Sequence, residues 1–325
     1  MSIWRRGLRG RFVLILIALL MTVRLTDRAV RQTYHGPGAG QITQDVVIPP
    51  GSAANVASVL AQAGVIAHPF LFRLAVILTR GQGVLHAGEF RFPAHESLAG
   101  ILNILRHGAP VQHQVTFPEG LTGQQIASIL NAAPAATGHV APPPDGAILP
   151  QTYDYLWGAK RDAILKRAEA ALHKQLSAAW DARASGLPIT TPRQALILAS
   201  IVQQETPLPA ELPKIAAVYE NRLKLGMKLQ ADPTVIFAVT DGKQSGGVGI
   251  TKADLANPSP YNTYVHGGLP PGPICAPGLA AIMAVLHPAD SQALYFVATG
   301  DGGHVFSRTF QQQLKNIERY RAQLK

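Results

Sequence analysis

Cysteine and charged residues are scarce in this chain of 325 residues. The single cysteine, Cys275, excludes an intramolecular disulfide, an iron–sulfur cluster held by this chain alone and a zinc site built on paired cysteines. Only 15% of the residues are charged and 47% are hydrophobic, which is not the composition of a disordered chain. We therefore expect a folded protein stabilised by packing, with the length of one large domain or two ordinary ones.

Complete motifs for metal, dinucleotide or serine-nucleophile chemistry are absent as well. The eleven histidines are scattered and show no HExxH spacing. Gly81-Gln-Gly83 lacks the later glycine of a dinucleotide-binding loop, and Ser245-Gly-Gly247 lacks the pattern of a nucleophile elbow. We expect neither a metal nor a cofactor.

The positive charge of the chain is concentrated at its amino-terminal end. Residues 1–31 hold seven arginines and one aspartate, a net charge of +6, which leaves only +4 for the other 294 residues. Affinity for nucleic acid needs lysines and arginines clustered along one surface of the folded part. The charge distribution therefore argues against a nucleic-acid partner.

An apolar run of 12 residues, 12–23, lies between Arg11 and Arg24. The basic residues upstream favour a signal anchor, a single transmembrane helix with its amino terminus in the cytoplasm. A cleaved signal peptide and a buried helix of a soluble protein are the alternatives, although no small-x-small cleavage site follows the run. The expected location is the inner membrane, crossed once, with the remainder of the chain in the periplasm.

The rest of the sequence predicts an α+β protein with two folded parts. Short alternating segments between helical ones indicate a small α+β module over 46–113, after an end, anchor and linker over 1–45. Residues 115–325 are expected to form a larger, mainly helical domain with a small sheet, a hairpin over 294–306 that encloses a glycine-rich turn.

The helix with the clearest ends is predicted over 192–205. Thr191 is a suitable N-cap, Pro192 fits the first turn, and Gln194 completes a capping box. Pro207 removes Thr206 from the helical region, which ends the helix one residue earlier.

Glu205 is the candidate catalytic residue of this helix. At 100° per residue, it projects from the same side as Leu198 and Ile201, so an acidic side chain points inward. Desolvation and the negative end of the helix dipole both favour the neutral carboxylic acid. A general acid needs that state, whereas a carboxylate neutralised by a buried arginine or capped by water would be merely structural.

Several segments of the sequence resemble the YceG-like family of endolytic murein transglycosylases, from the amino-terminal anchor to about Phe306. The segments are Ala199-Ser-Ile-Val-Gln-Gln-Glu-Thr206, Val218-Tyr-Glu-Asn-Arg-Leu223, Gly226-Met-Lys-Leu-Gln-Ala-Asp-Pro-Thr-Val235, residues 257–278 and residues 295–304. The resemblance implies a membrane-anchored enzyme with a LysM-like module and a catalytic domain that cleaves nascent peptidoglycan. It places the catalytic glutamate of the family on Glu205. Two departures from the family pattern are Gln203-Gln204 and Leu149-Pro-Gln-Thr-Tyr153.

Five further residues in or near these segments are candidates for substrate binding. Gln230 and Asn262 carry amides that could bond to sugar hydroxyls or acetamido groups. Tyr261 and Tyr264 could stack on a sugar ring or simply pack. Asp232 is expected first of all to be the N-cap of a short helix, and otherwise a cleft residue.

Three functions follow from these patterns. The first is a lytic transglycosylase in which Glu205 alone serves as acid and then base, leaving 1,6-anhydro-N-acetylmuramic acid ends. The second is a hydrolytic muramidase that also uses Asp232 or another acid, because ordinary glycosidases need two carboxyl groups. The third is a peptidoglycan-binding scaffold without activity. The expected partners are glycan strands, the membrane and peptidoglycan synthases.

Overall fold

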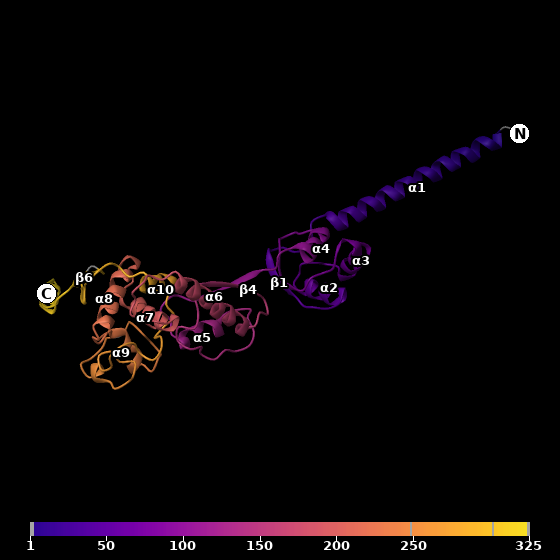
Figure 1. Cartoon of the computed structure of the whole chain (residues 1–325). Helices are drawn as coiled ribbons and strands as arrows, with labels where there is room; N and C mark the ends of the chain where they lie inside the picture. The colour runs from indigo at the N-terminus through magenta and orange to yellow at the C-terminus, as the bar shows by residue number, and fades with distance from the viewer. Residues whose placement is uncertain (1–2, 248, 301, 324–325) are drawn as a thin grey trace. The chain divides into compact units, whose positions relative to one another are not determined.

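A computed structural model describes residues 3–247, 249–300 and 302–323 of the chain. The chain divides into two compact units, unit 1 over residues 1–113 and unit 2 over residues 114–325 (Figure 1). Both units combine helices with short strands, so the expected α+β class is confirmed.

Unit 1 begins with a long helix, α1 (Ile3–His35). The apolar run at residues 12–23 belongs to this helix, and its described side chains are largely exposed. No helix among the described residues is long and apolar enough to cross a membrane, because charged residues interrupt every longer stretch of α1. The transmembrane helix expected from the sequence is therefore not supported.

The remainder of unit 1 places three helices against one pair of strands. Their order is β1 (Gln44–Ile48), α2 (Ala53–Gln62), α3 (Pro69–Leu78), β2 (Gly88–Phe92) and α4 (Leu98–His107). The strands β1 and β2 are antiparallel, with Val46 opposite Phe90. Alternate strand residues point inward, and Phe90 and Phe92 are buried against Leu60, Phe72 and Leu105.

Unit 2 is mainly helical, with two short sheets. Its elements are β3 (Gln112–Thr116), α5 (Gly123–Ala132), β4 (Thr152–Leu156), α6 (Arg161–Asp181), α7 (Pro192–Glu205), α8 (Leu212–Lys224), α9 (Asp232–Val239), α10 (Leu279–Leu286), β5 (Tyr295–Ala298), β6 (His304–Ser307) and α11 (Phe310–Gln323). The strand β3 pairs with β4, and β5 pairs with β6 as the predicted hairpin. The sequence analysis identified no strand at β4.

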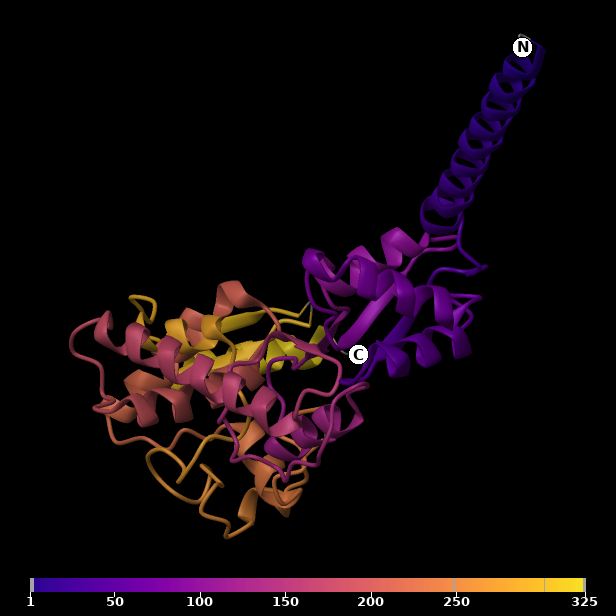
Figure 2. The ribbon, with the colours of Figure 1, turned by 90° about the vertical axis from the view of Figure 1, so that its right-hand side faces the viewer.

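The helix α7 is the centre of the core of unit 2. It packs against α6, α8, α9 and α10, and Leu198, Ile201 and Val202 are fully buried. Thr191 caps α7 as predicted, since its hydroxyl accepts from the backbone N–H of Gln194. The reciprocal bond of the predicted capping box differs, because the Gln194 side chain accepts from Thr190 instead of Thr191. The hairpin lies beside α8 and α11, in yellow in Figure 2.

A buried carboxyl group on α8 lowers the free energy of unfolding at high pH. The Glu220 side chain is 1% exposed, and among the described residues neither of its oxygens has a hydrogen-bond partner. Burial raises the pKa of Glu220 from 4.5 to about 7, with Lys224 opposing. When folding raises the pKa of an acid, the acid does not lower the free energy of unfolding at a pH below its pKa in the unfolded state. The full destabilisation is present at a pH above its pKa in the folded state.

We therefore expect Glu220→Gln to stabilise the protein selectively at high pH. The free energy of unfolding should match that of wild type near pH 4.5 and exceed it at pH 8 by on the order of 2–3 kcal/mol, because a neutral amide needs no desolvation of charge. Urea unfolding at the two pH values measures this difference. An equal effect at both would show that the ionisation of Glu220 is not responsible.

Candidate active site

Glu205 is the last residue of α7, and its side chain is partly buried. The apolar face that buries Leu198 and Ile201 continues to this position, which directs the carboxyl group toward α8 instead of into solvent. The next residue, Thr206, is extended and buried. The inward orientation predicted for Glu205 is thus present.

Tyr219 of α8 covers the carboxyl group. Its hydroxyl donates a hydrogen bond to Oε1 of Glu205, and the side chain is 1% exposed. Burial raises the pKa of Tyr219 well above 10, and the negative charge of Glu205 adds to this effect. The phenol therefore stays protonated and acts only as a donor.

Arg222, one turn further along α8, supplies a buried positive charge. Its guanidinium donates to the backbone carbonyls of Leu229 and Leu294 and lies 5.3 Å from the centre of the Tyr295 ring. These contacts hold the cation in place, and no carboxylate among the described residues forms an ion pair with it. Arg222 is thus free to act on the charge of Glu205 through space.

Asp232 and Tyr264 form a pair near the same carboxyl group. The Tyr264 hydroxyl donates to Oδ1 of Asp232 over 2.6 Å, and Asp232 is exposed. The expectation that Asp232 is an N-cap is wrong, because α9 is capped at Ala231 and Asp232 is its first residue. Asp232 remains in the first turn, where the helix dipole favours a negative charge.

The pKa of Glu205 is raised from 4.5 to about 7 by these surroundings. Desolvation is the largest cause, and the Asp232 carboxylate raises the value further. The hydrogen bond from Tyr219 and the charge of Arg222 lower it. The result is an acid that holds its proton about half of the time at neutral pH, which suits both donation and acceptance of a proton.

Within the described residues, no group of three or more His, Cys, Asp or Glu side chains is arranged to hold a metal ion.

Gln230 precedes α9 in a strained conformation. Its φ angle is +50°, a left-handed value that is uncommon for residues other than glycine. Its backbone N–H bonds to the Thr263 carbonyl, while its side chain is exposed. Residues held in such conformations cluster at functional sites, and the amide of Gln230 is available to a ligand.

Asn262 and Tyr261 have other surroundings. Asn262 is fully buried, and its side chain donates to the carbonyls of Leu255 and Asn257 and accepts from the N–H of Tyr264. Its amide therefore shapes the loop that carries Tyr264, and direct contact with a sugar is not supported. Tyr261 packs on Phe237, with ring centres 4.7 Å apart, at the edge of a 470 Å³ pocket that Asp145 also lines.

Comparison with known proteins identifies the family. Residues 46–319 match the YceG-like family. This chain belongs to the YceG-like family. The resemblance found in the sequence is confirmed over most of the chain.

Two curated relatives and one crystal structure illustrate the range of this family. An endolytic murein transglycosylase of Bacillus subtilis (strain 168) is 29% identical over 313 residues, covering 86% of this chain and 85% of the relative. An endolytic murein transglycosylase of Streptococcus pneumoniae serotype 2 (strain D39) is 26% identical, covering 80% of this chain and 55% of the relative, so the chain spans about half of that protein. A YceG-like protein from Listeria monocytogenes has a TM-score of 0.52 and 25% identity, covering 84% of this chain and 98% of that one.

Three residues around the carboxyl group of this YceG-like chain were not identified as site residues from sequence. Tyr219 lies in a quoted family segment but resembles an ordinary core aromatic residue. Glu211 and His304 are hydrogen-bonded, with 2.7 Å between Oε2 and Nδ1, and Glu211 also accepts from the hydroxyl of Thr206. This pair ties the residue that follows Glu205 to strand β6. Its connection to the site is the hydrogen bond from Thr206 to Glu211, which the spacing in sequence does not reveal.

We expect two conservative substitutions to move the pH dependence of a YceG-like activity in opposite directions. A general acid works while protonated, so the rate falls as the pH rises through its pKa. Tyr219→Phe removes a hydrogen bond that lowers the pKa of Glu205, so the alkaline limb should move to higher pH. Asp232→Asn removes a negative charge that raises it, so the limb should move to lower pH. Glycan cleavage rates across neutral pH measure both shifts, and a common direction would contradict the assignment of the limb to Glu205.

Proposed function

We propose that this chain is an endolytic lytic transglycosylase of peptidoglycan, with Glu205 as its catalytic residue. The observation that carries the proposal is the carboxyl group of Glu205, whose pKa of about 7 suits it to donate a proton and then to accept one. Membership of the YceG-like family and relatives named endolytic murein transglycosylase support it.

Glu205 would act twice in the reaction. Its proton passes to the oxygen that links N-acetylmuramic acid to N-acetylglucosamine, and the bond from C1 of the muramic residue to that oxygen breaks. The carboxylate so formed removes the proton of the muramic 6-hydroxyl, whose oxygen bonds to C1. The carboxylic acid is restored, no water is consumed, and the attacking group is already tethered to the sugar.

The other residues at the site would assist Glu205. The negative charge of Asp232 keeps the pKa of Glu205 high and would stabilise the positive charge that develops at C1. The exposed amide of Gln230 is proposed to bond to the sugar, and Tyr264 to hold Asp232 in position. Asn262 and Tyr261 have no part in this proposal.

The product distinguishes the three candidate functions. Mass spectrometry of uncrosslinked glycan strands treated with purified protein should show 1,6-anhydro ends, each lighter by one water than a hydrolytic end, at internal positions of the strand. Reducing ends would instead indicate a muramidase in which Asp232 activates water. Absence of any cleavage would favour the scaffold.

We also propose that the two units divide the work. The strand–helix–helix–strand order β1–α2–α3–β2 supports a LysM-like module that positions the enzyme on glycan, and Glu205 lies in unit 2. Residues 115–325 alone should then cleave glycan less efficiently than the full chain, whereas residues 46–113 alone should be inert. Cleavage by the small module would refute this division.

The proposed place of action is the periplasmic side of the inner membrane. The substrate lies there, and exposed apolar side chains of α1 next to arginines support attachment of α1 to that membrane. Glycan strands leaving peptidoglycan synthases would be within reach of unit 2. Recovery of the chain in the membrane fraction, with unit 2 cut only by protease added to the periplasmic side, would support this location, and recovery in the soluble fraction would refute it.

A further inference from the structure

The outer side of α3 is as apolar as its inner side. Phe72 and Ala75 point into the core of unit 1. The outer side exposes four large apolar side chains: Phe70 (70% exposed), Leu74 (40%), Ile77 (62%) and Leu78 (75%). Single exposed apolar residues are common on proteins, whereas four large ones on one side of a ten-residue helix form a patch that marks a contact with lipid or protein. This face therefore needs an occupant.

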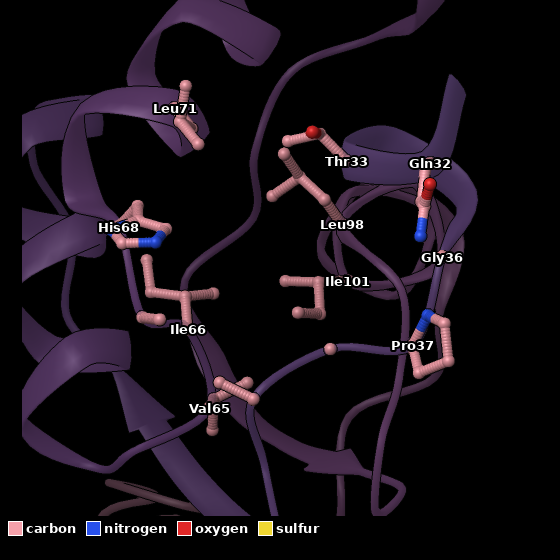
Figure 3. A pocket seen from close by; sticks show the side chains of 13 residues that line it. Gln32, Thr33, Gly36, Pro37, Val65, Ile66, His68, Leu71, Leu98 and Ile101 are labelled. Atoms are coloured by element: carbon pink, nitrogen blue, oxygen red, sulfur yellow. The ribbon is translucent and has the colours of Figure 1, made fainter. Parts of the chain in front are cut away.

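An apolar groove continues the exposed face of α3 toward α1. The groove has a volume of 430 Å³, and Val30 and Tyr34 of α1 line it together with Leu74 and Leu78 of α3. A pocket of 310 Å³ adjoins it between the end of α1 and the turn before α3, as Figure 3 shows. Groove and pocket share Thr33, Leu71 and Leu98. Groove and pocket are therefore neighbours along the same side of unit 1.

The stretch of chain that includes α3 carries only positively charged side chains among its Asp, Glu, Lys and Arg residues. Residues 46–88 contain two arginines and no aspartate or glutamate. Both arginines, Arg73 on the outer side of α3 and Arg80 just after it, are exposed. We name Phe70, Arg73, Leu74, Ile77, Leu78 and Arg80 the α3 patch. Within the part of the chain that the structure describes, neither arginine has an ion-pair partner. Exposed apolar side chains beside such cationic ones are the surface that anionic lipid recognises.

We propose that the α3 patch docks unit 1 on an anionic lipid surface. Phe70, Leu74 and Ile77 enter the boundary between headgroups and acyl chains, acyl chains fill the groove beside α1, and Arg73 and Arg80 contact lipid phosphates. The groove residue Val30 follows the apolar run of α1 by seven residues, a rise of about 10 Å along the helix, so attachment of α1 to a membrane would bring the groove near the same lipid surface. This last step rests on the proposed attachment of α1, whereas the patch itself does not.

The neighbouring helix provides an internal comparison. The exposed residues of α2 are small or polar and uncharged: Ala54, Asn55, Ser58 and Gln62. Both helices belong to one module, so a general property of its surface would affect them alike. A probe on α2 therefore serves as a matched control for a probe on α3.

Environment-sensitive fluorophores on single introduced cysteines test the proposal in the full chain. Ile77→Cys reports on the patch, Ser58→Cys on the control surface and Leu19→Cys on α1. The native Cys275 is buried and stays unlabelled. Each labelled chain is mixed with vesicles of phosphatidylglycerol and phosphatidylethanolamine, and protection from an aqueous collisional quencher is measured.

We expect the Ile77 probe to be shielded by these vesicles and the Ser58 probe to stay accessible. Adding Arg73→Gln or Arg80→Gln should lower the ratio of docked to free module by about five-fold each. A Leu19 probe that is shielded while the Ile77 probe is not would overturn docking of α3 and leave the attachment of α1 standing. Equal shielding by vesicles of phosphatidylcholine alone would overturn the assignment to anionic lipid. Shielding without vesicles that grows with protein concentration would identify a second copy of the chain as the occupant and also overturn the proposal.

Discussion

Glu205→Gln should abolish glycan cleavage while leaving the fold intact. The amide keeps the shape of the carboxyl group and can still accept the hydrogen bond from Tyr219, but it has no proton to donate and cannot take one up. Loss of general acid–base catalysis alone lowers a rate by roughly 10²–10⁴-fold, and in the proposed mechanism one residue serves as both acid and base. Release of soluble fragments from purified glycan strands measures the loss.

Gln204→Glu is the matched control for this substitution. Gln204 precedes the proposed catalytic residue, and its amide donates to the Gly120 carbonyl and to the Ser245 hydroxyl. We expect Gln204→Glu to retain cleavage. If Glu205→Gln remained active while Gln204→Glu changed the rate, Glu205 would not be the catalytic acid. Thermal unfolding of Glu205→Gln should be cooperative, and its stability at pH 8 should not fall below that of wild type, because the ionised carboxylate is costly there.

Arg222→Met should have the largest effect on stability of the substitutions around the site. The guanidinium satisfies the Leu229 and Leu294 carbonyls, and a thioether leaves both without their charged donor. Hydrogen bonds to charged groups contribute about 1.5–3 kcal/mol each, so we expect the free energy of unfolding to fall by about 3 kcal/mol. Urea unfolding measures this change.

A control on an exposed helix position separates charge from contact. Lys174→Met removes a positive charge from the exposed side of α6, where we expect a change of no more than about 0.5 kcal/mol. Similar losses for both variants would mean that net charge, and not the two carbonyl contacts, determines the effect. Arg222→Met should also move the alkaline limb of activity to higher pH, because Arg222 lowers the pKa of Glu205.

Local signals explain why α7 and the inward position of Glu205 could be predicted from sequence. Thr191, Pro192 and Pro207 mark the ends of the helix by chemistry that acts within a few residues. The apolar period then fixes which side of the helix is buried, and Glu205 falls on it. Strand β4 escaped prediction because Thr152–Leu156 is short and pairs with β3, which lies far away in sequence.

Asp232 was a candidate residue from sequence, but the proximity of Glu205 to its partners could not be predicted because the partners come from separate elements. Tyr219 and Arg222 belong to α8 and Asp232 to α9, and only tertiary packing sets their distances from the carboxyl group. The role of Asn262 is a different case, because a buried amide and an amide that binds sugar are the same residue type in a sequence. Its three internal hydrogen bonds, visible only in the structure, decide between them.

The bond from Tyr219 to Oε1 divides the two oxygens of Glu205 between different tasks. One oxygen accepts from the phenol, so in the proposed mechanism we expect the other oxygen, Oε2, to exchange the proton with the substrate. The leaving oxygen and the 6-hydroxyl would then approach the same oxygen, one after the other. Two separate molecules would have to replace one another at this oxygen. Two groups of one sugar can instead reach it in turn by a small rotation. Proton transfer through one oxygen of Glu205 would therefore favour a substrate that carries its own nucleophile.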